Sequence, residues 1–131
     1  LSDANIQIDE NLIILETSIE DFDVKLQELI SSKKMDAIFA LDEHSATASM
    51  KMALKQGIKI PEELNIIGFA DGVWSRRLTP SLSTVSQHAP EIGAKAAELL
   101  IHKLNSKDEF YQPQTVVIKT ELRQRESTRK L

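Results

Sequence analysis

The chain contains no cysteine among its 131 residues. This excludes disulfide bonds and thiolate metal sites, and it is compatible with a reducing cytosol. No apolar run approaches the roughly 20 residues that a membrane-spanning helix needs, and no secretory leader is recognisable at Leu1. The formal net charge of −4 argues against this piece binding phosphate backbones by itself. We therefore expect a protein with no membrane segment.

Glycine is scarce as well. There are only 4 glycines and none cluster, so neither a phosphate-binding loop nor a dinucleotide fingerprint is present. No Ser/His/Asp arrangement of a hydrolase is recognisable. The histidines, His44, His88 and His102, lack the close-spaced pairing typical of zinc ligands. We expect no catalytic residue, no metal and no cofactor, and hence not an enzyme.

Two hydrophobic periodicities alternate along the first half of the chain. Continuous apolar runs, typical of strands buried on both faces, occupy residues 12–16, 37–41 and 64–69. Helical spacing of apolar residues predicts helices over 19–31 and 44–56, with Ser18 as an N-cap and Gly57 as a stop signal. This order predicts an α/β fold, a parallel sheet flanked by helices.

The second half follows a different pattern. Residues 74–78 are compatible with one short helical turn, and 83–86 with a short strand. Pro90 suits the first turn of a third helix, whose apolar stripe includes Ile92, Ala96, Leu99, Leu100 and Leu104. A last strand is predicted over 115–122. The basic residues after it are interrupted by acids, so we interpret them as a solvated terminus rather than a nucleic-acid patch.

Polar side chains follow each predicted strand. Ligands of open parallel sheets bind beyond the carboxyl ends of the strands, which points to residues 16–18, 42–44 and 70–72. Ser18 is better explained as a helix cap. For Asp42 and Asp71, helix capping or dipole compensation and ligand binding are equally good explanations.

Several segments together resemble one known family. Residues 60–71, with the Gly68-Phe69 turn, and residues 78–87 closely resemble the effector-binding core of the lac repressor/gal repressor family, as do the segments 36–40, 91–100 and 120–127. The resemblance implies part of a type I periplasmic-binding-protein-like domain. It implies that 1–87 is most of the C-terminal subdomain, that 88–114 crosses to the N-terminal subdomain, and that 115–131 returns.

The resemblance also implies a ligand site in an inter-subdomain crevice. The matching positions, taken as ligand-binding, are Thr17, Asp42, Ala70, Asp71, Gln87 and His88. The family usually has an acid that bonds sugar hydroxyls where this chain has Ala70, with Asp71 one step later. We expect Asp42, Asp71, Gln87 and His88 to face one crevice, with Asp42 as the main anchor for a small polar effector, most plausibly a saccharide.

The resemblance implies a homodimer and a DNA-binding helix-turn-helix that lies outside this chain. The positions that match the family's dimer surface are Thr47, Met50, Lys51, Leu54, Trp74 and Leu78. We expect Met50 to be exposed beside Leu54. For Trp74, an alternative role as a buried anchor of its own loop is equally compatible with the sequence.

Two other function classes compete with a cytoplasmic transcription regulator. A periplasmic solute-binding protein, which would bind a sugar, shares the fold. A phospho-acceptor receiver domain also has carboxylates at strand ends, but it needs a paired acid cluster after its first strand and a nearby Lys, which Glu16 and Lys119 fit badly.

Overall fold

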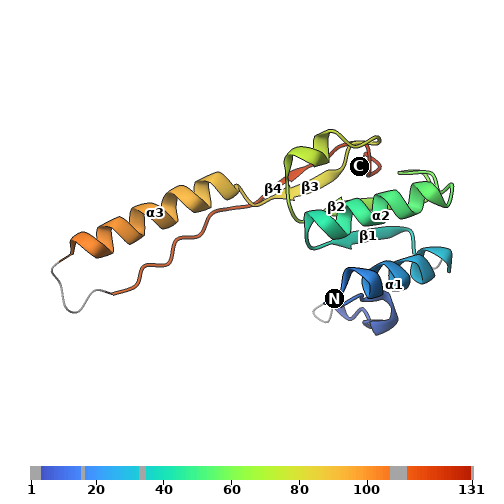
Figure 1. The fold of residues 1–131 in the computed structure, drawn as a ribbon, viewed down its shortest axis with the longest axis horizontal. Coiled ribbons are helices and arrows are strands. Elements are labelled where there is room, and N and C mark those ends of the chain that lie inside the picture. Colours follow the sequence, from blue (N-terminus) through green and yellow to red (C-terminus); the bar gives the residue numbers. More distant parts are fainter. Residues whose placement is uncertain (1–3, 16, 33–34, 107–111, 131) are drawn as a thin grey trace.

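The computed structural model describes residues 4–15, 17–32, 35–106 and 112–130. Within them lies one four-stranded sheet in the order β1-β2-β3-β4, shown in Figure 1. The first three strands run parallel and the fourth is antiparallel to β3. The strands are β1 (Ala37–Ala40), β2 (Asn65–Gly68), β3 (Ser83–Ser86) and β4 (Glu121–Arg123). The helical elements are η2 (Glu10–Leu12), α1 (Ile19–Ser31), α2 (Glu43–Lys55), η3 (Val73–Arg76) and α3 (Ala89–Asn105).

The two helices of the first half form where the sequence predicts them. Ser18 caps α1, and its hydroxyl accepts a hydrogen bond from the Asp21 amide at 3.0 Å. Just beyond α2, Gly57 has a φ of +74°, a conformation that favours glycine. Because caps and stop signals act within a few residues, they are readable from sequence alone.

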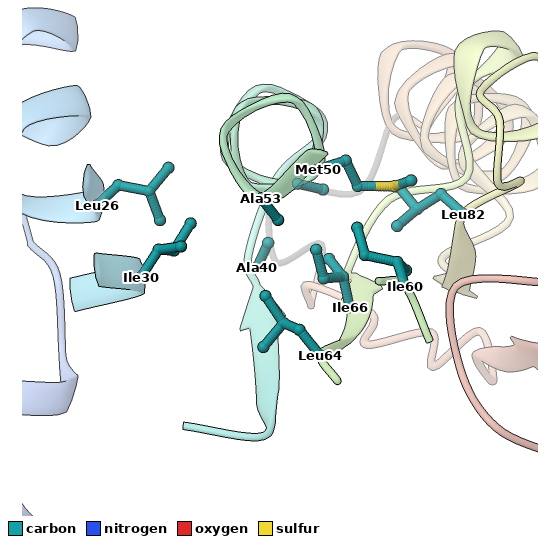
Figure 2. Close-up of a cluster of buried hydrophobic side chains, with 10 residues drawn as sticks. Leu26, Ile30, Ala40, Met50, Ala53, Ile60, Leu64, Ile66 and Leu82 are labelled. Carbon is teal, nitrogen blue, oxygen red and sulfur yellow. The ribbon is translucent and has the colours of Figure 1, made fainter. Parts of the chain in front are cut away.

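The hydrophobic core lies between α2, α1 and one face of the sheet (Figure 2). Met50 and Ala53 of α2 face Ala40 of β1 and Ile66 of β2, and Leu26 and Ile30 attach α1 to this cluster. Ile60, Leu64 and Leu82 come from the loops that enter β2 and β3. The parallel pairing of β1 with β2 confirms the predicted βαβ order.

The predicted buried strand over 12–16 is wrong. Residues 10–12 form the 3-10 helix η2, residues 13–15 are unpaired, and residue 16 lies outside the described part. Leu15 is 79% exposed, and Leu12 and Ile13 are about half exposed. An apolar run becomes a strand only where its backbone groups pair with a neighbouring strand. Among the described residues β1 pairs with β2 alone, so residues 13–15 do not use its other edge.

Two other predicted strands are corrected in part. The run 37–41 forms β1, but it is an edge strand with one exposed face, since Phe39 is 57% exposed. The predicted strand 115–122 is paired only over Glu121–Arg123, while residues 112–120 have no regular structure. Ser83–Ser86 agrees with the prediction, and the helical turn near Trp74 spans Val73–Arg76.

Helix α3 projects away from the sheet, and the returning segment 112–120 extends to the same side (Figure 1). Pro90 lies in its first turn, as predicted. No residue of α3 is buried, and its apolar stripe, including Leu100 and Leu104, faces solvent. No helix in the described ranges is both long enough and apolar enough to span a membrane.

The C-terminal segment is attached to the sheet through Ser127, which is fully buried. Its hydroxyl donates to the carbonyl of Ile66 at 2.6 Å and accepts from the amide of Ser83 at 2.8 Å. The amide of Ile66 in turn donates to the carbonyl of Ser127. These bonds join the end of the chain to β2 and β3, and they provide partners for the backbone groups of Ile66 and Ser83.

Candidate functional site

A recess of about 530 Å³ opens beyond the carboxyl ends of β2 and β3, beside the start of α3. Four residues predicted to bind ligand line it: Ala70, Asp71, Gln87 and His88. Glu43 and Gly72, from the strand-end loops 42–44 and 70–72, also line it, and no sequence pattern indicated Arg76, Ser86 or Arg123. No group of three or more His, Asp or Glu side chains in the described ranges is arranged to hold a metal ion.

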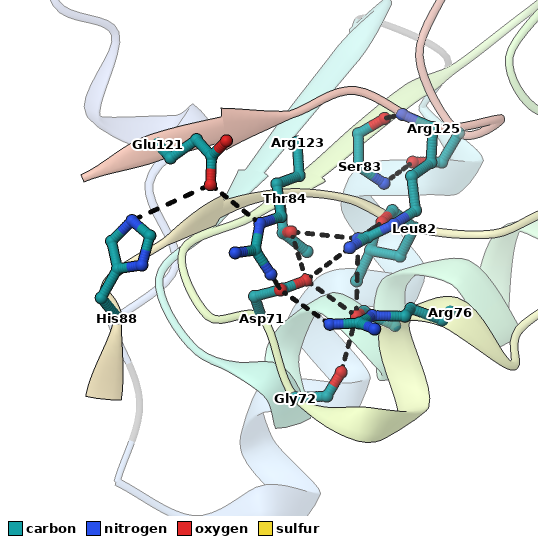
Figure 3. Close-up of polar contacts among 12 residues, drawn as sticks. Asp71, Gly72, Arg76, Leu82, Ser83, Thr84, His88, Glu121, Arg123 and Arg125 are labelled. Atoms are coloured by element: carbon teal, nitrogen blue, oxygen red, sulfur yellow. Dashed lines mark hydrogen bonds and ion pairs between the residues drawn. The ribbon is translucent and has the colours of Figure 1, made fainter. Parts of the chain in front are cut away.

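Asp71 is the most heavily engaged side chain of the recess (Figure 3). Its carboxylate is only 4% exposed. Oδ1 accepts hydrogen bonds from Arg125 Nη2 at 2.7 Å, Thr84 Oγ1 at 2.8 Å and Ser75 Oγ at 3.2 Å. Oδ2 is paired with Arg123. Both oxygens therefore serve to attach β4 and the residues after it to β3 and η3.

The pKa of Asp71 reflects this network. Burial alone would raise the pKa, but hydrogen bonds from Arg125 and Thr84, the positive charge of Arg125 and the Ser75 hydroxyl outweigh it. The pKa of the Asp71 carboxyl is thus held well below its usual range. Asp71 is an anion whose primary partners are within the chain.

Arg123 and Arg125 correct the interpretation of the tail as solvated. Their side chains are about one third and one seventh exposed, and both contact Asp71. Arg123 also bonds Glu121, and Arg125 donates to Thr84 Oγ1 at 3.0 Å. No local pattern reveals these contacts, because Arg125 and Asp71 are 54 residues apart.

Gln87 and His88 form the passage from β3 into α3. Gln87 Nε2 donates to the carbonyl of Phe69 at 2.6 Å, which connects the exit of β3 to that of β2. His88 adopts the left-handed conformation with φ +55°, and its Nε2 lies 3.8 Å from a carboxylate oxygen of Glu121. Both side chains are partly exposed at the recess.

Asp42 and Thr17 are placed differently from the expected crevice. Asp42 is the N-cap of α2: its Oδ1 accepts the Ser45 amide at 2.8 Å, and a reciprocal contact with the Ser45 hydroxyl completes a capping box. Neither Asp42 nor Thr17 lines the recess. The capping role that the sequence left open for Asp42 is the one observed. Ala70 lines the recess but supplies no polar group there.

The residues predicted for self-association do not form one exposed surface. Met50 is only 1% exposed and belongs to the core, so its predicted exposure is wrong. The helical stripe turns it inward with Ala46 and Ala53. Trp74, in contrast, is 61% exposed with Arg77 over its ring, which contradicts the buried-anchor alternative. Lys51 and Leu54 are exposed, whereas Thr47 and Leu78 are half-buried.

Comparison with known proteins agrees with this geometry. Residues 3–128 match the model of the periplasmic binding protein-like domain family. The HTH-type transcriptional regulator DegA of Bacillus subtilis is 35% identical over 96 residues, 72% of this chain and 28% of that protein. The chain spans about a third of the length of the curated relatives it matches.

The solved structures that resemble this chain are also transcription regulators. The transcription regulator CcpA of Lactococcus lactis superposes with a TM-score of 0.81 at 29% identity, over 98% of this chain and 46% of that one. A LacI family regulator from Arthrobacter sp. FB24, in complex with lactose, has a TM-score of 0.75 at 26% identity, over 89% and 45%.

These relatives are transcription regulators, so neither the solute-binding nor the receiver alternative is favoured. The chain belongs to the periplasmic-binding-protein-like domain family, in the form that regulators of the lac repressor type carry.

Proposed function

We propose that this chain is the ligand-sensing part of a bacterial DNA-binding transcription regulator, and that it binds a small saccharide effector in the recess beside Gln87 and His88. The observation that carries the proposal is the recess itself, at the carboxyl ends of parallel strands where ligands of such sheets bind. The lactose complex of the Arthrobacter relative supports a sugar as the ligand class.

The chemistry of the recess suits a sugar. Each hydroxyl both donates and accepts hydrogen bonds, and the recess offers both kinds of partner. Glu43 is an acceptor and Arg123 a donor, while the imidazole of His88 can be either. The small side chain of Ala70 leaves room for a ligand between these polar groups.

The projecting α3 supports the proposed domain division. Residues 1–87 are assigned to one subdomain, 88–114 to the crossing segment, and 115–131 to the returning strand and tail. The exposed apolar stripe of α3 then packs inside the other subdomain, which closes over the recess. DNA binding belongs to a helix-turn-helix elsewhere in the protein, which places the regulator in the cytoplasm.

His88 provides the test of the sugar site. We expect His88→Asn in the complete protein to weaken lactose binding by about tenfold to a hundredfold, as expected for one lost hydrogen bond in a closed site. Asn tolerates the left-handed conformation of this position, so the backbone should be preserved. Isothermal titration calorimetry measures the affinity, and gel-shift assays without sugar should show unchanged operator binding.

His102→Asn is the matched control, because it makes the same substitution on α3 away from the recess. It should leave the affinity for lactose within about twofold. If His88→Asn binds lactose as tightly as the parent does, the recess is not the sugar site.

We propose further that the regulator is a homodimer whose interface includes the exposed residues Trp74, Leu54 and Lys51. Exposed aromatic side chains at the centre of an interface dominate its energy. Trp74→Ala and Leu54→Arg in the complete protein should each raise the dimer dissociation constant more than tenfold by analytical ultracentrifugation. Lys59→Ala, a surface change elsewhere, should not. Two variants that remain as tightly dimeric as the parent would place the interface on another surface.

A further inference from the structure

Glu43 occupies an unusual position in the recess. It is the first residue of α2, directly after the Asp42 cap. Its carboxylate lies where a side chain on Gly72 would be: a β-carbon built on Gly72 would be 2.0 Å from Oε1 and 2.4 Å from Cδ. Gly72 has a φ of −71°, which any residue adopts. Glycine is therefore required at position 72 because the Glu43 carboxylate occupies the space of a side chain, and not because the backbone conformation favours glycine.

One oxygen of this carboxylate has no partner. Oε1 of Glu43 is buried and accepts no hydrogen bond in the described part of the chain. The cationic groups nearby are engaged with other acids: Arg123 with Asp71 and Glu121, and His88 with Glu121. A buried acceptor without a donor is costly, so a donor brought to this carboxylate, which lines the recess, would offset that cost.

Two neighbouring acids are unsuited to that task. Asp71 is surrounded by donors from its own chain, and Asp42 caps α2 outside the recess. Ala70 contributes no polar atom. Among the carboxylates close to the exit of β2, Glu43 alone has an acceptor oxygen that is both buried and unpaired in the described residues.

We propose that Glu43 is the principal acceptor for the effector, receiving a hydrogen bond from a sugar hydroxyl or from the ammonium group of an amino sugar. The proposal rests on the proposed function and names the residue that recognises the ligand. Gly72 is a positioning residue, since it makes the room in which the Glu43 carboxylate lies.

The test uses two substitutions that act on the same carboxylate in different ways. Glu43→Ala removes the carboxylate. Gly72→Ala displaces the carboxylate, and this should cost little stability because the displaced group is the end of a flexible side chain. In the complete protein, calorimetry with lactose, D-glucose and D-glucosamine measures affinity. Each variant should weaken the sugars that the parent binds by about tenfold to a hundredfold. The double variant should be no weaker than Glu43→Ala, since both changes remove one contact.

A matched control separates this contact from general effects. Glu20→Ala removes an acid from the first turn of α1, away from the recess. It should bind sugar as the parent does. A greater loss for D-glucosamine than for D-glucose on Glu43→Ala identifies an ammonium donor, and equal losses identify a hydroxyl.

The contrary outcomes are distinct. A parent that binds lactose together with a Glu43→Ala variant of equal affinity overturns the role of Glu43 and leaves the sugar-sensing function standing. If Gly72→Ala binds sugar as tightly as the parent while Glu43→Ala binds it more weakly, the ligand does not meet the Glu43 carboxylate in its position beside Gly72, and the positioning role of Gly72 is overturned. A parent that binds none of the three sugars overturns the proposed ligand class and this inference with it.

Discussion

Asp71→Ala is expected to lower the free energy of unfolding by about 3–5 kcal/mol, because removing one partner of a buried ion pair leaves the other charge uncompensated. The guanidinium of Arg125 is largely buried and donates to Asp71, Thr84 and the carbonyl of Leu82. Without the carboxylate, β4 and the residues after it lose the side-chain bonds of Arg123 and Arg125 to Asp71. Urea unfolding of the complete protein, followed by circular dichroism, measures the change.

Arg76→Ala is the control for this prediction. Arg76 also faces Asp71, at 3.7 Å, but its side chain is 65% exposed. Exposed pairs contribute only about 0–1 kcal/mol, so this variant should unfold close to the parent. Equal losses in Asp71→Ala and Arg76→Ala would show that the buried bonds to Arg125 do not carry the stability of this edge.

The same carboxylate predicts a dependence on pH. Its folded pKa lies below the unfolded value of about 3.9. A lowered folded pKa means that the stabilisation is fully present above the unfolded pKa and is lost as pH falls towards the folded one. Below about pH 4, the parent should therefore lose stability more steeply than Asp71→Asn does.

Met50→Ala is expected to destabilise the protein by about 2–5 kcal/mol, the usual cost of a large-to-small change in a packed core. Met50 is fully buried among Ala53, Ile66 and Leu82 (Figure 2). Little collapse is available around it, because α2 is fixed to the sheet by small residues such as Ala46. Thermal unfolding of the complete protein measures the loss.

Val24→Ala, on the exposed side of α1, is the matched control because Val24 lies outside the proposed dimer interface. Val24 is 57% exposed, so its truncation should change stability by less than about 1 kcal/mol. A Met50→Ala variant as stable as the parent would mean that the core does not extend under α2.

Helices and caps were predictable because their signals are local. The stripe that contains Leu26 and Ile30, and the cap at Ser18, specify α1 without reference to the rest of the chain. The parallel order of β1 and β2 followed from the alternation of strand and helix. The outcome at 12–16 was not predictable in this way, because an apolar run becomes a strand only if the folded chain places it against a sheet edge, and the edge of β1 stays unpaired in the described residues.

The site, too, could be predicted only in part from local patterns. The family resemblance and the strand-end rule indicated the exits of β2 and β3, and the recess lies there with Gln87 and His88 at its wall. Spacing alone could not distinguish Asp42 from Glu43, since adjacent residues at a helix start differ only in the direction of their side chains.

Local patterns and motifs were enough to predict the helices, the parallel βαβ order, the family and the region of the chain that borders the recess. The folded chain was needed to see that Asp71 is bonded by Arg123 and Arg125, that Met50 is buried, and that Glu43 lies against Gly72 with an unpaired oxygen. Periodicity and capping act over a few residues, whereas these contacts join segments tens of residues apart, and their partners are known only once the chain has folded.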